Sequence, residues 1–367
     1  MKLIMTDDQR ELASSVRSFL AGTAPMARVR EIAESPEPYD PRVWERMSGE
    51  LGLTGLAIPE EHGGAGAGHG EVSAVLEELG AALTPAPFFA SAVLAANVLL
   101  EAGDQEARKA YLPGIAAGTT VATFAVPGDG PAPEVRDGKL HGSVPHVLNG
   151  ADAGLILIAA EDGLYAVESG AEGLTRTPLT TLDLTRPEAR LEFAGTPARR
   201  IGSVGGVRAD GVRAGGEGAD GIRRALDLAT VALAAEQLGG LRRCLDTIVE
   251  YAKLRVQFGR FVGSFQGVKH KLADMQCTLE QAESIVRYAA WAADESPEEL
   301  PVAAALAGSY MGRAYFQVAK DHLLLHGGIG FTWEHDAHLY YKRAKSSQVL
   351  LGSPRHHRAR LSEALFA

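Results

Sequence analysis

The sequence has 367 residues, which is long enough to form two or three domains with cores of their own. Hydrophobic residues make up 46% of it and charged residues 22%, as in ordinary globular proteins. The formal net charge of −10 at pH 7 argues against a nucleic-acid backbone as a partner.

The chain opens without the pattern of a targeting segment. The charged residues Asp7 and Asp8 follow Met1-Lys-Leu-Ile-Met-Thr6 at once, where a signal peptide would continue with apolar residues. No apolar run in the sequence is long enough to span a membrane. We therefore expect a cytoplasmic protein with no membrane span.

Residues 1–118 are predicted to form an N-terminal all-α domain. Thr6 followed by Gln9 resembles the capping pattern at the start of a helix. Residues 71–83 have the pattern of an amphipathic helix, and residues 88–100 are apolar enough for a buried helix.

Residues 119–203 are predicted to form a middle domain of short strands. Residues 155–159 and 164–167 are apolar runs on either side of Glu161-Asp-Gly163, which has the pattern of a hairpin turn. Residues 190–193 fit another strand. Short strands at this spacing suggest a small barrel or a sandwich.

A Gly- and Ala-rich stretch with scattered charges, residues 204–221, is predicted to be a flexible linker. It is followed by a helical-bundle domain over residues 222–367, with helices starting near Gly221 and long helices expected at 300–326 and 337–351. In the helix that leads to Arg255, apolar residues recur every three or four positions: Leu238, Leu241, Leu245, Ile248 and Ala252.

The cysteines and histidines indicate neither a disulfide framework nor a metal site. Cys244 and Cys277 both fall in predicted helices, where we expect reduced core thiols. His326 is expected to pack or to bond backbone. The remaining candidates are two close pairs without the i,i+4 spacing of a helical zinc site: His335 with His338, and His356 with His357.

The turn between the helix leading to Arg255 and the helix opening at Gln266 has an unusual composition. It holds two Arg, two Gln and three Phe residues. Arg can grip a phosphate in a bidentate way, Phe offers a ring face, and Gln offers both a donor and an acceptor. This set suits a nucleotide-like ligand with a diphosphate. On composition alone, an ordinary helix connection with surface Arg and core Phe residues is the alternative.

Three segments together resemble the acyl-CoA dehydrogenase family. The first, Arg255-Val-Gln-Phe-Gly259 followed by Ser264-Phe-Gln-Gly-Val-Lys-His-Lys-Leu-Ala-Asp-Met275, is similar to the helical hairpin of that family. The second, Leu325-His-Gly-Gly-Ile-Gly-Phe-Thr-Trp-Glu-His335, resembles its glycine loop. The third is Gly55-Leu-Ala-Ile-Pro-Glu-Glu-His-Gly-Gly64. The segments occur in the order and at the separations usual in the family, so the resemblance spans nearly the whole chain.

The resemblance implies an α+β fold, with an N-terminal helical domain, a middle β-barrel and a C-terminal four-helix bundle. It implies FAD as the cofactor and α,β-desaturation of an acyl-CoA thioester as the reaction, in which a carboxylate removes the α proton. In the family, FAD lies across the interface of an oligomer, and an electron-transferring flavoprotein commonly accepts the electrons.

Residues of this sequence match the positions with which the family holds the adenosine diphosphate end of FAD. The paired glycines match a loop whose bare backbone comes close to the pyrophosphate, although a helix–helix turn is the alternative for them alone. The matching residues are Arg255, Gln257, Phe258, Gln266, Gly327 and Gly328.

The residues at the catalytic end depart from the family. Leu351 stands where many members carry the catalytic Glu, and Ala229 stands where others carry it. The stretches that correspond to the flavin-ring contacts are Ala125-Val-Pro-Gly128 and His146-Val-Leu148, which lack the hydroxyl groups of the family. Leu324 replaces a Gln that usually precedes the paired glycines.

Glu236 is a weak candidate for a displaced base, because it lies two helical turns after Ala229 on roughly the same helix face. A buried or interface helix element is the alternative for it.

Three hypotheses follow for the function. In the first, the chain is a partner subunit that completes the FAD site of a paralogous catalytic chain, as in actinobacterial enzymes for steroid side chains, whose non-catalytic partners are similar in the ending Lys345-Ser-Ser-Gln-Val-Leu-Leu-Gly352. In the second, it is a homo-oligomeric acyl-CoA dehydrogenase with an unrecognised base. In the third, it is a binding or scaffold protein that has lost FAD. The acyl chain is left open.

Overall fold

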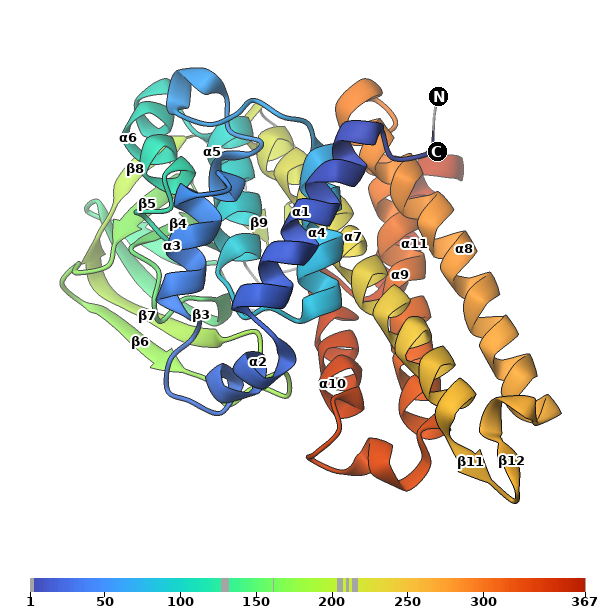
Figure 1. Ribbon diagram of the computed structural model, residues 1–367. Helices are drawn as coiled ribbons and strands as arrows, with labels where there is room; N and C mark the ends of the chain where they lie inside the picture. The colour runs from blue at the N-terminus through green and yellow to red at the C-terminus, as the bar shows by residue number, and fades with distance from the viewer. Residues whose placement is uncertain are drawn as a thin grey trace. The chain divides into compact units, whose positions relative to one another are not determined.

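The computed structural model describes residues 3–126, 132–160, 162–202, 207–208, 211–212 and 217–366 (Figure 1). The chain divides into two compact units. The helical unit comprises Met1–Val29, His69–Thr84 and Thr230–Ala367, and the sheet unit comprises Arg30–Gly68 and Pro85–Ala229. Two helices run across the boundary between them in the sequence, α2 (Met26–Ala33) and α7 (Glu217–Leu254).

The helical unit is built from long helices, and its predicted start is confirmed. The hydroxyl of Thr6 accepts from the backbone N–H of Gln9 at 3.2 Å, and the side chain of Gln9 accepts from the N–H of Thr6 at 3.0 Å, which is a capping box. Besides most of α7, the unit contains α1 (Asp7–Thr23), α4 (His69–Ala82), α8 (Gln266–Glu295), α9 (Leu300–Leu325), α10 (Ala337–Ser347) and α11 (Pro354–Phe366).

Several predictions for the C-terminal helices are confirmed and others need correction. The stripe from Leu238 to Ala252 is buried, as expected. The described part of residues 204–221, expected to be a flexible linker, contains regular structure. α7 begins at Glu217, and β9 (Val207–Arg208) pairs with β10 (Gly211–Val212). The helix expected at 337–351 ends at Ser347, and Leu351 lies in the following turn with a left-handed φ of 58°.

α4 is buried around nearly its whole circumference, so the prediction of an amphipathic helix at this position is wrong. An amphipathic helix would direct Glu77 and Glu78 to solvent, yet both are buried. Their charges are balanced by arginines from helices distant in sequence, a long-range effect that a local pattern does not reveal. Glu78 binds Arg17 of α1 through two hydrogen bonds of 2.9 and 2.6 Å.

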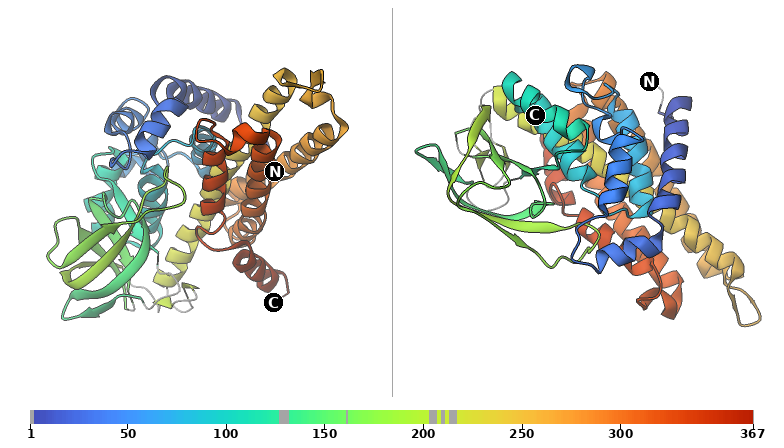
Figure 2. Two further views of the ribbon diagram at one scale, coloured as in Figure 1. Left: turned by 90° about the horizontal axis from the view of Figure 1, so that it is seen from below. Right: turned by 60° about the vertical axis from the view of Figure 1, so that its left-hand side comes forward.

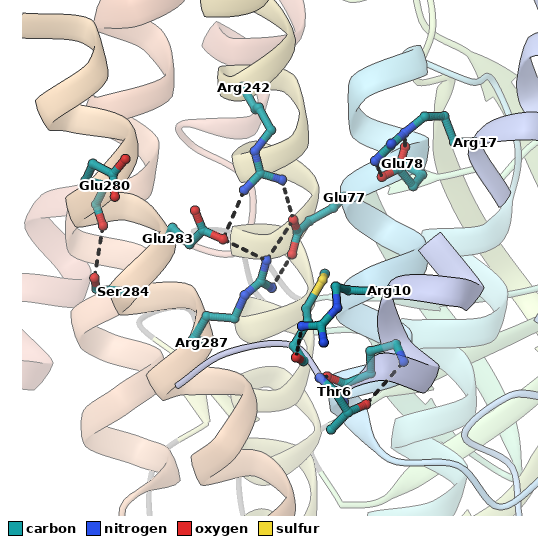
Figure 3. A network of polar contacts seen from close by, with 12 residues as sticks. Thr6, Arg10, Arg17, Glu77, Glu78, Arg242, Glu280, Glu283, Ser284 and Arg287 are labelled. Carbon is teal, nitrogen blue, oxygen red and sulfur yellow. Dashed lines mark hydrogen bonds and ion pairs between the residues drawn. The ribbon is translucent and has the colours of Figure 1, made fainter. Parts of the chain in front are cut away.

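Glu77 joins three helices through a buried network of charges (Figure 3). Its carboxylate accepts from Arg287 of α8 and, at 2.9 Å, from Arg242 of α7. Glu283 lies 3.3 Å from Arg242 and 3.4 Å from Arg287. Burial alone would lower the pKa of Arg287, but the hydrogen bonds and charges of these two carboxylates raise it above its ordinary value. The network therefore ties α7 and α8 to α4.

The sheet unit contains two four-stranded sheets that share one apolar core. The first has the order β1-β4-β5-β8, with β1 parallel to β4, and the second has the order β2-β3-β7-β6. Ile156 and Tyr165 of the first sheet and Leu140 and Leu191 of the second belong to the same buried cluster. The strands are β1 (Ala122–Ala125), β2 (Glu134–Arg136), β3 (Lys139–Leu148), β4 (Leu155–Ala159), β5 (Leu164–Glu168), β6 (Leu174–Pro178), β7 (Glu188–Pro197) and β8 (Arg199–Gly202).

The strands expected at 155–159, 164–167 and 190–193 are therefore present, whereas Glu161 of the expected hairpin turn lies outside the described residues. Among the described strands, no pairing closes either sheet into a ring. Helices complete the unit, and the apolar segment 88–100 is helical and buried, as predicted. These elements are α3 (Pro41–Gly49), η1 (Leu53–Gly55), η2 (Glu60–His62), the π-helical η3 (Phe89–Ala95), α5 (Ala96–Ala102) and α6 (Gln105–Ala116).

Within the described part of the chain, no helix combines the length and apolar character that crossing a bilayer requires.

Candidate cofactor-binding site

The predicted helical hairpin is present, and a small β-ribbon forms its tip. α7 ends at Leu254, β11 (Val256–Gln257) pairs antiparallel with β12 (Arg260–Phe261), and the chain passes through η4 (Val262–Ser264) into α8. The two turn residues, Phe258 and Gly259, have φ angles of 52° and 74°. Positive φ at both central positions is the requirement of a type I′ turn, whose twist matches that of the flanking strands.

Phe258 is held in an unfavourable conformation and yet is almost fully exposed. A bulky residue at positive φ carries backbone strain, and 93% of Phe258 is open to solvent, so no burial within this chain compensates for the strain. Its ring meets Phe265 edge to face at 6.2 Å, and the guanidinium of Arg260 lies 4.0 Å over the Phe265 ring. Arg260 and Phe265 thus support a presented aromatic ring.

The other predicted residues of the hairpin also lie on the surface. Arg255 is exposed, and its backbone N–H still donates to Tyr251 in helical fashion at 2.9 Å. Gln257 is exposed and donates to the carbonyl of Val256 at 2.8 Å. Gln266 is the exposed first residue of α8.

The glycine loop follows α9 as the short helix η5 (Gly327–Phe331). A Cβ added at Gly327 or Gly328 would meet no atom within 4 Å, whereas one added at Gly330 would lie 2.4 Å from the carbonyl oxygen of Leu323. Gly330 is therefore required by packing and Gly327 by its φ of 67°. Nothing in the packing of this chain requires a glycine at Gly328, and its bare backbone faces open space.

Two polar contacts join the hairpin to the helix that carries the glycine loop. The hydroxyl of Thr247 and Nε2 of His322 are 2.9 Å apart, and one turn further the hydroxyl of Tyr251 donates to the carbonyl of His326 at 3.2 Å. Residues four apart share a helix face, so Arg255 continues the row of Thr247 and Tyr251. Figures 1 and 2 agree that the β11–β12 ribbon and η5 lie at the same end of the helical unit.

Three histidine rings pack together beneath this end. The ring centroids of His322 and His326 are 4.6 Å apart, and those of His326 and His335 are 4.2 Å apart. Burial, with the neighbouring His326 and His335, lowers the pKa of His322 to about 3, and burial also lowers the pKa of His326. His322 is therefore neutral at pH 7. His326 packs and bonds backbone, as expected, with its Nδ1 2.8 Å from the carbonyl of His322.

The same end exposes a group of large apolar side chains. Phe331 and Trp333 of the glycine loop are 64% and 67% exposed, and Lys342 lies 4.1 Å over the Trp333 ring. Clustered apolar exposure of this kind marks a surface that another molecule covers. The remaining members are Leu254, Val256, Phe258, Phe261, Leu324 and Ile329.

The positions at which the resemblance leads us to expect a catalytic Glu or flavin-ring contacts carry mainly apolar side chains. Ala229 is fully buried, Leu351 is half-buried, and Leu148 is 7% exposed. His146 is exposed and its Nδ1 lies 2.9 Å from the carboxylate of Glu188. Ala125 is buried in β1, while Pro127 and Gly128 of the first ring-contact stretch lie outside the described residues.

Glu236 forms a buried ion pair with Arg343 of α10, in which both side chains are less than one-tenth exposed. A carboxylate held in this way by a buried guanidinium is a structural partner. The geometry favours the helix-element interpretation of Glu236 over a role as displaced base.

Of the two cysteines, Cys244 is buried, and burial raises the pKa of its thiol, but Cys277 is exposed on α8, so the expectation of two core thiols is wrong for Cys277. No group of three or more His, Cys, Asp or Glu side chains in the described ranges is arranged to hold a metal ion.

Tyr251 was not singled out from the sequence, and Arg260 and Phe265 were counted only in the composition of the turn, without individual roles. The signal for Tyr251 was available, since it precedes Arg255 by one helical turn. The stacking of Arg260 on Phe265 depends on the strand pairing at the tip, which spacing alone does not define.

Comparisons with known proteins identify relatives of this chain. The family model described as acyl-CoA dehydrogenase, C-terminal domain, matches residues 216–366, and the model for the N-terminal domain matches residues 6–119. The acyl-CoA dehydrogenase IpdE2 of Mycolicibacterium smegmatis is 33% identical over 362 residues, which cover 99% of this chain and 100% of the relative.

Two solved structures are similar over almost the full length. A chain of the ChsE4-ChsE5 complex from Mycobacterium tuberculosis is 28% identical, with a TM-score of 0.89 and coverage of 100% of this chain and 99% of that chain. A chain of a Tcur3481-Tcur3483 steroid ACAD variant is 29% identical, with a TM-score of 0.85 and coverage of 98% of both chains.

Proposed function

The chain belongs to the acyl-CoA dehydrogenase family, and we propose that within it the chain completes the FAD site of a paralogous catalytic subunit. The family consists of flavin-dependent oxidoreductases that dehydrogenate acyl-CoA. The proposal is carried by the exposed end of the helical unit, formed by the hairpin tip and the glycine loop. There, the packing of this chain accounts neither for the strained conformation of Phe258 nor for the absence of a side chain at Gly328.

The nucleotide end of FAD fits the residues of this tip. Arg255 would supply the charge for the diphosphate, and the open backbone at Gly327 and Gly328 would allow its close approach. Phe258 would cover the ligand with a ring face. Gln257 and Gln266 add exposed donors and acceptors. FAD held there would supply the hydride acceptor for the family's dehydrogenation of acyl-CoA.

The ring end of FAD does not fit this chain. A base within hydrogen-bond reach of the α carbon is required for proton removal, and neither Leu351 nor Ala229 can accept a proton. Loss of a positioned general base costs about 10²–10⁴ in rate. The contribution of this chain is therefore to bind and orient the nucleotide end, while a second subunit supplies the base.

The relatives support a mixed assembly. One similar structure is named as a complex of two chains, ChsE4 and ChsE5, and another pairs Tcur3481 with Tcur3483 in a steroid ACAD. By this analogy we expect the substrate class to be the CoA thioester of a steroid-derived acid. We also expect the family's division of the chain, with boundaries near residues 118, 203 and 221 and a barrel-like middle domain formed by the two sheets.

The test is the visible spectrum of the chain purified alone and purified after co-expression with a neighbouring paralogue. We expect colourless protein alone, and a yellow complex that is bleached by acyl-CoA when the paralogue is present. Yellow protein alone that acyl-CoA bleaches would contradict the proposal and support a homo-oligomeric enzyme. Colourless protein in both preparations would instead support a scaffold that has lost FAD.

A further inference from the structure

We infer that Tyr251 is a positioning residue, which fixes the position of the glycine loop relative to the hairpin tip. Its hydroxyl donates to the carbonyl of His326, the residue directly before Gly327, and its ring packs against the His326 ring with centroids 4.5 Å apart. The inference rests on the proposed role of the tip in binding FAD, because it concerns how the two halves of that site are held together.

The carbonyl of His326 lies where a helix leaves its last acceptors without partners. α9 ends at Leu325, and the final carbonyls of a helix must find donors outside it. The donor at His326 comes from α7, the helix that continues into the tip. A single hydrogen bond therefore links the start of the glycine loop to the helix turn that precedes Arg255.

A second contact, one turn earlier on both helices, fixes the position of α7 along α9. Thr247 donates to the carbonyl of Arg243 at 2.8 Å, so its oxygen is free to accept from Nε2–H of His322. Two successive turns of α7 thus meet two successive turns of α9. Such a pair fixes the height of one helix relative to the other, which a single contact would not do. Arg255 follows Tyr251 by one turn, and Gly327 directly follows His326.

The far side of the loop is held by its own contacts and by the histidine stack. Thr332 donates backbone and hydroxyl hydrogens to the carbonyl of Ile329 at 3.0 and 2.8 Å. His335 accepts from the N–H of Ala337 at 3.1 Å and packs on His326. These contacts shape the loop, whereas the bond from Tyr251 sets its position against the hairpin.

The experiment compares Tyr251→Phe with the wild-type full-length chain, and Tyr310→Phe serves as the matched control. Tyr251→Phe removes the hydroxyl and keeps the ring that packs on His326. Tyr310 lies on α9, the helix that leads into the glycine loop, and its hydroxyl donates to Gln281 at 2.9 Å, away from that loop. The first readout is hydrogen exchange of the amides of residues 327–336.

We expect Tyr251→Phe to raise the exchange rate of these amides about fivefold, the factor that a hydrogen bond of average strength contributes. The melting temperature should stay within about 2 °C of wild type, and Tyr310→Phe should leave residues 327–336 unchanged. Unchanged exchange in Tyr251→Phe, or an equal rise throughout the bundle, overturns the inference.

The second readout is the dissociation constant for FAD of the complex with the co-expressed paralogue, with Arg255→Ala as the reference variant. We expect about fivefold weaker FAD binding for Tyr251→Phe and a larger loss for Arg255→Ala. Weaker binding for Arg255→Ala with no change for Tyr251→Phe overturns the positioning role alone. No change in either variant overturns the proposed function and, with it, the role of Tyr251.

Discussion

Two regions of the molecule differ in exposure. The tip of the helical unit is open to solvent, whereas the positions expected to hold the catalytic base are wholly or partly buried. At the tip, Arg255, Phe258 and Gly328 are exposed, and the strain at Phe258 and the missing side chain at Gly328 bring no benefit to this chain alone. At the base positions, Ala229 and Leu351 are apolar and wholly or partly buried. Packing and stability explain the apolar residues at the base positions, but they do not explain the exposed residues at the tip.

This contrast separates residues kept for packing from residues kept for a ligand or a partner. A residue kept for packing is satisfied by its own neighbours, whereas a residue kept for a ligand or a partner is incomplete in the isolated chain. By this criterion we propose that the chain keeps residues that bind a dinucleotide and lacks the base that the reaction needs beside the flavin ring.

The largest expected effect is the loss of stability on replacing Glu236. This residue tests the contrast, because a catalytic role for it would give this chain a base of its own. Glu236→Gln removes the charge that Glu236 places against the buried guanidinium of Arg343, so we expect a loss of about 3–5 kcal/mol in the free energy of unfolding by denaturant titration. Per folded complex, turnover should be unchanged. A 10²-fold fall in turnover with normal stability would make Glu236 the base and erase the contrast. The double variant with Arg343→Met is the control, and it should recover much of the stability.

The second effect concerns binding at the tip. Arg255→Ala should weaken FAD binding by the assembled complex about 10- to 100-fold, since hydrogen bonds to charged groups contribute about 1.5–3 kcal/mol. The melting temperature of the free chain should not change, because Arg255 is exposed. Equilibrium dialysis of FAD checks the first expectation, and unchanged flavin content would remove Arg255 from the site.

The third effect separates two glycines of one loop. Gly330→Ala brings a Cβ to 2.4 Å from the Leu323 carbonyl, and we expect it to cost about 1–3 kcal/mol of stability. Gly328→Ala meets no atom within 4 Å and should leave the melting temperature unchanged, while FAD binding weakens about tenfold. Equal melting temperatures together with equal FAD affinities for Gly328→Ala and wild type would contradict the ligand role of this backbone.

The smallest effect is the pH dependence of stability beneath the tip. The unfolded chain protonates His322 near pH 6.5, whereas the folded chain holds its pKa at about 3, so the unfolded state binds more protons as the pH falls. Stability should therefore decrease below pH 6.5, by about 1.5 kcal/mol between pH 6.5 and pH 5 for this residue. His322→Asn should reduce that slope in urea titrations. The same slope in both proteins would show that His322 is not responsible.

Local patterns in the sequence predicted much of the fold. The capping box at Thr6, the buried stripe from Leu238 to Ala252 and the hairpin that turns at Phe258 follow from spacing within one or two helical turns. The six cofactor-binding residues remain predictions, carried by the resemblance and by the exposure of the tip.

Contacts between segments far apart in the sequence could not be predicted from local patterns. The amphipathic prediction for α4 failed because Glu77 is paired with Arg242 and Arg287, more than 160 positions away in sequence. The stacking of His326 on His335 and of Arg260 on Phe265 depends on how the segments meet in space. A pattern confined to one segment carries no information on such contacts.

The most direct test is an experimental structure of the chain in complex with its catalytic paralogue and FAD. The account predicts that the guanidinium of Arg255 lies about 3 Å from a phosphate oxygen of FAD, with the backbone of Gly327 and Gly328 against the same diphosphate. An Arg255 directed away from the dinucleotide, or FAD held among residues of the paralogue alone, would contradict it.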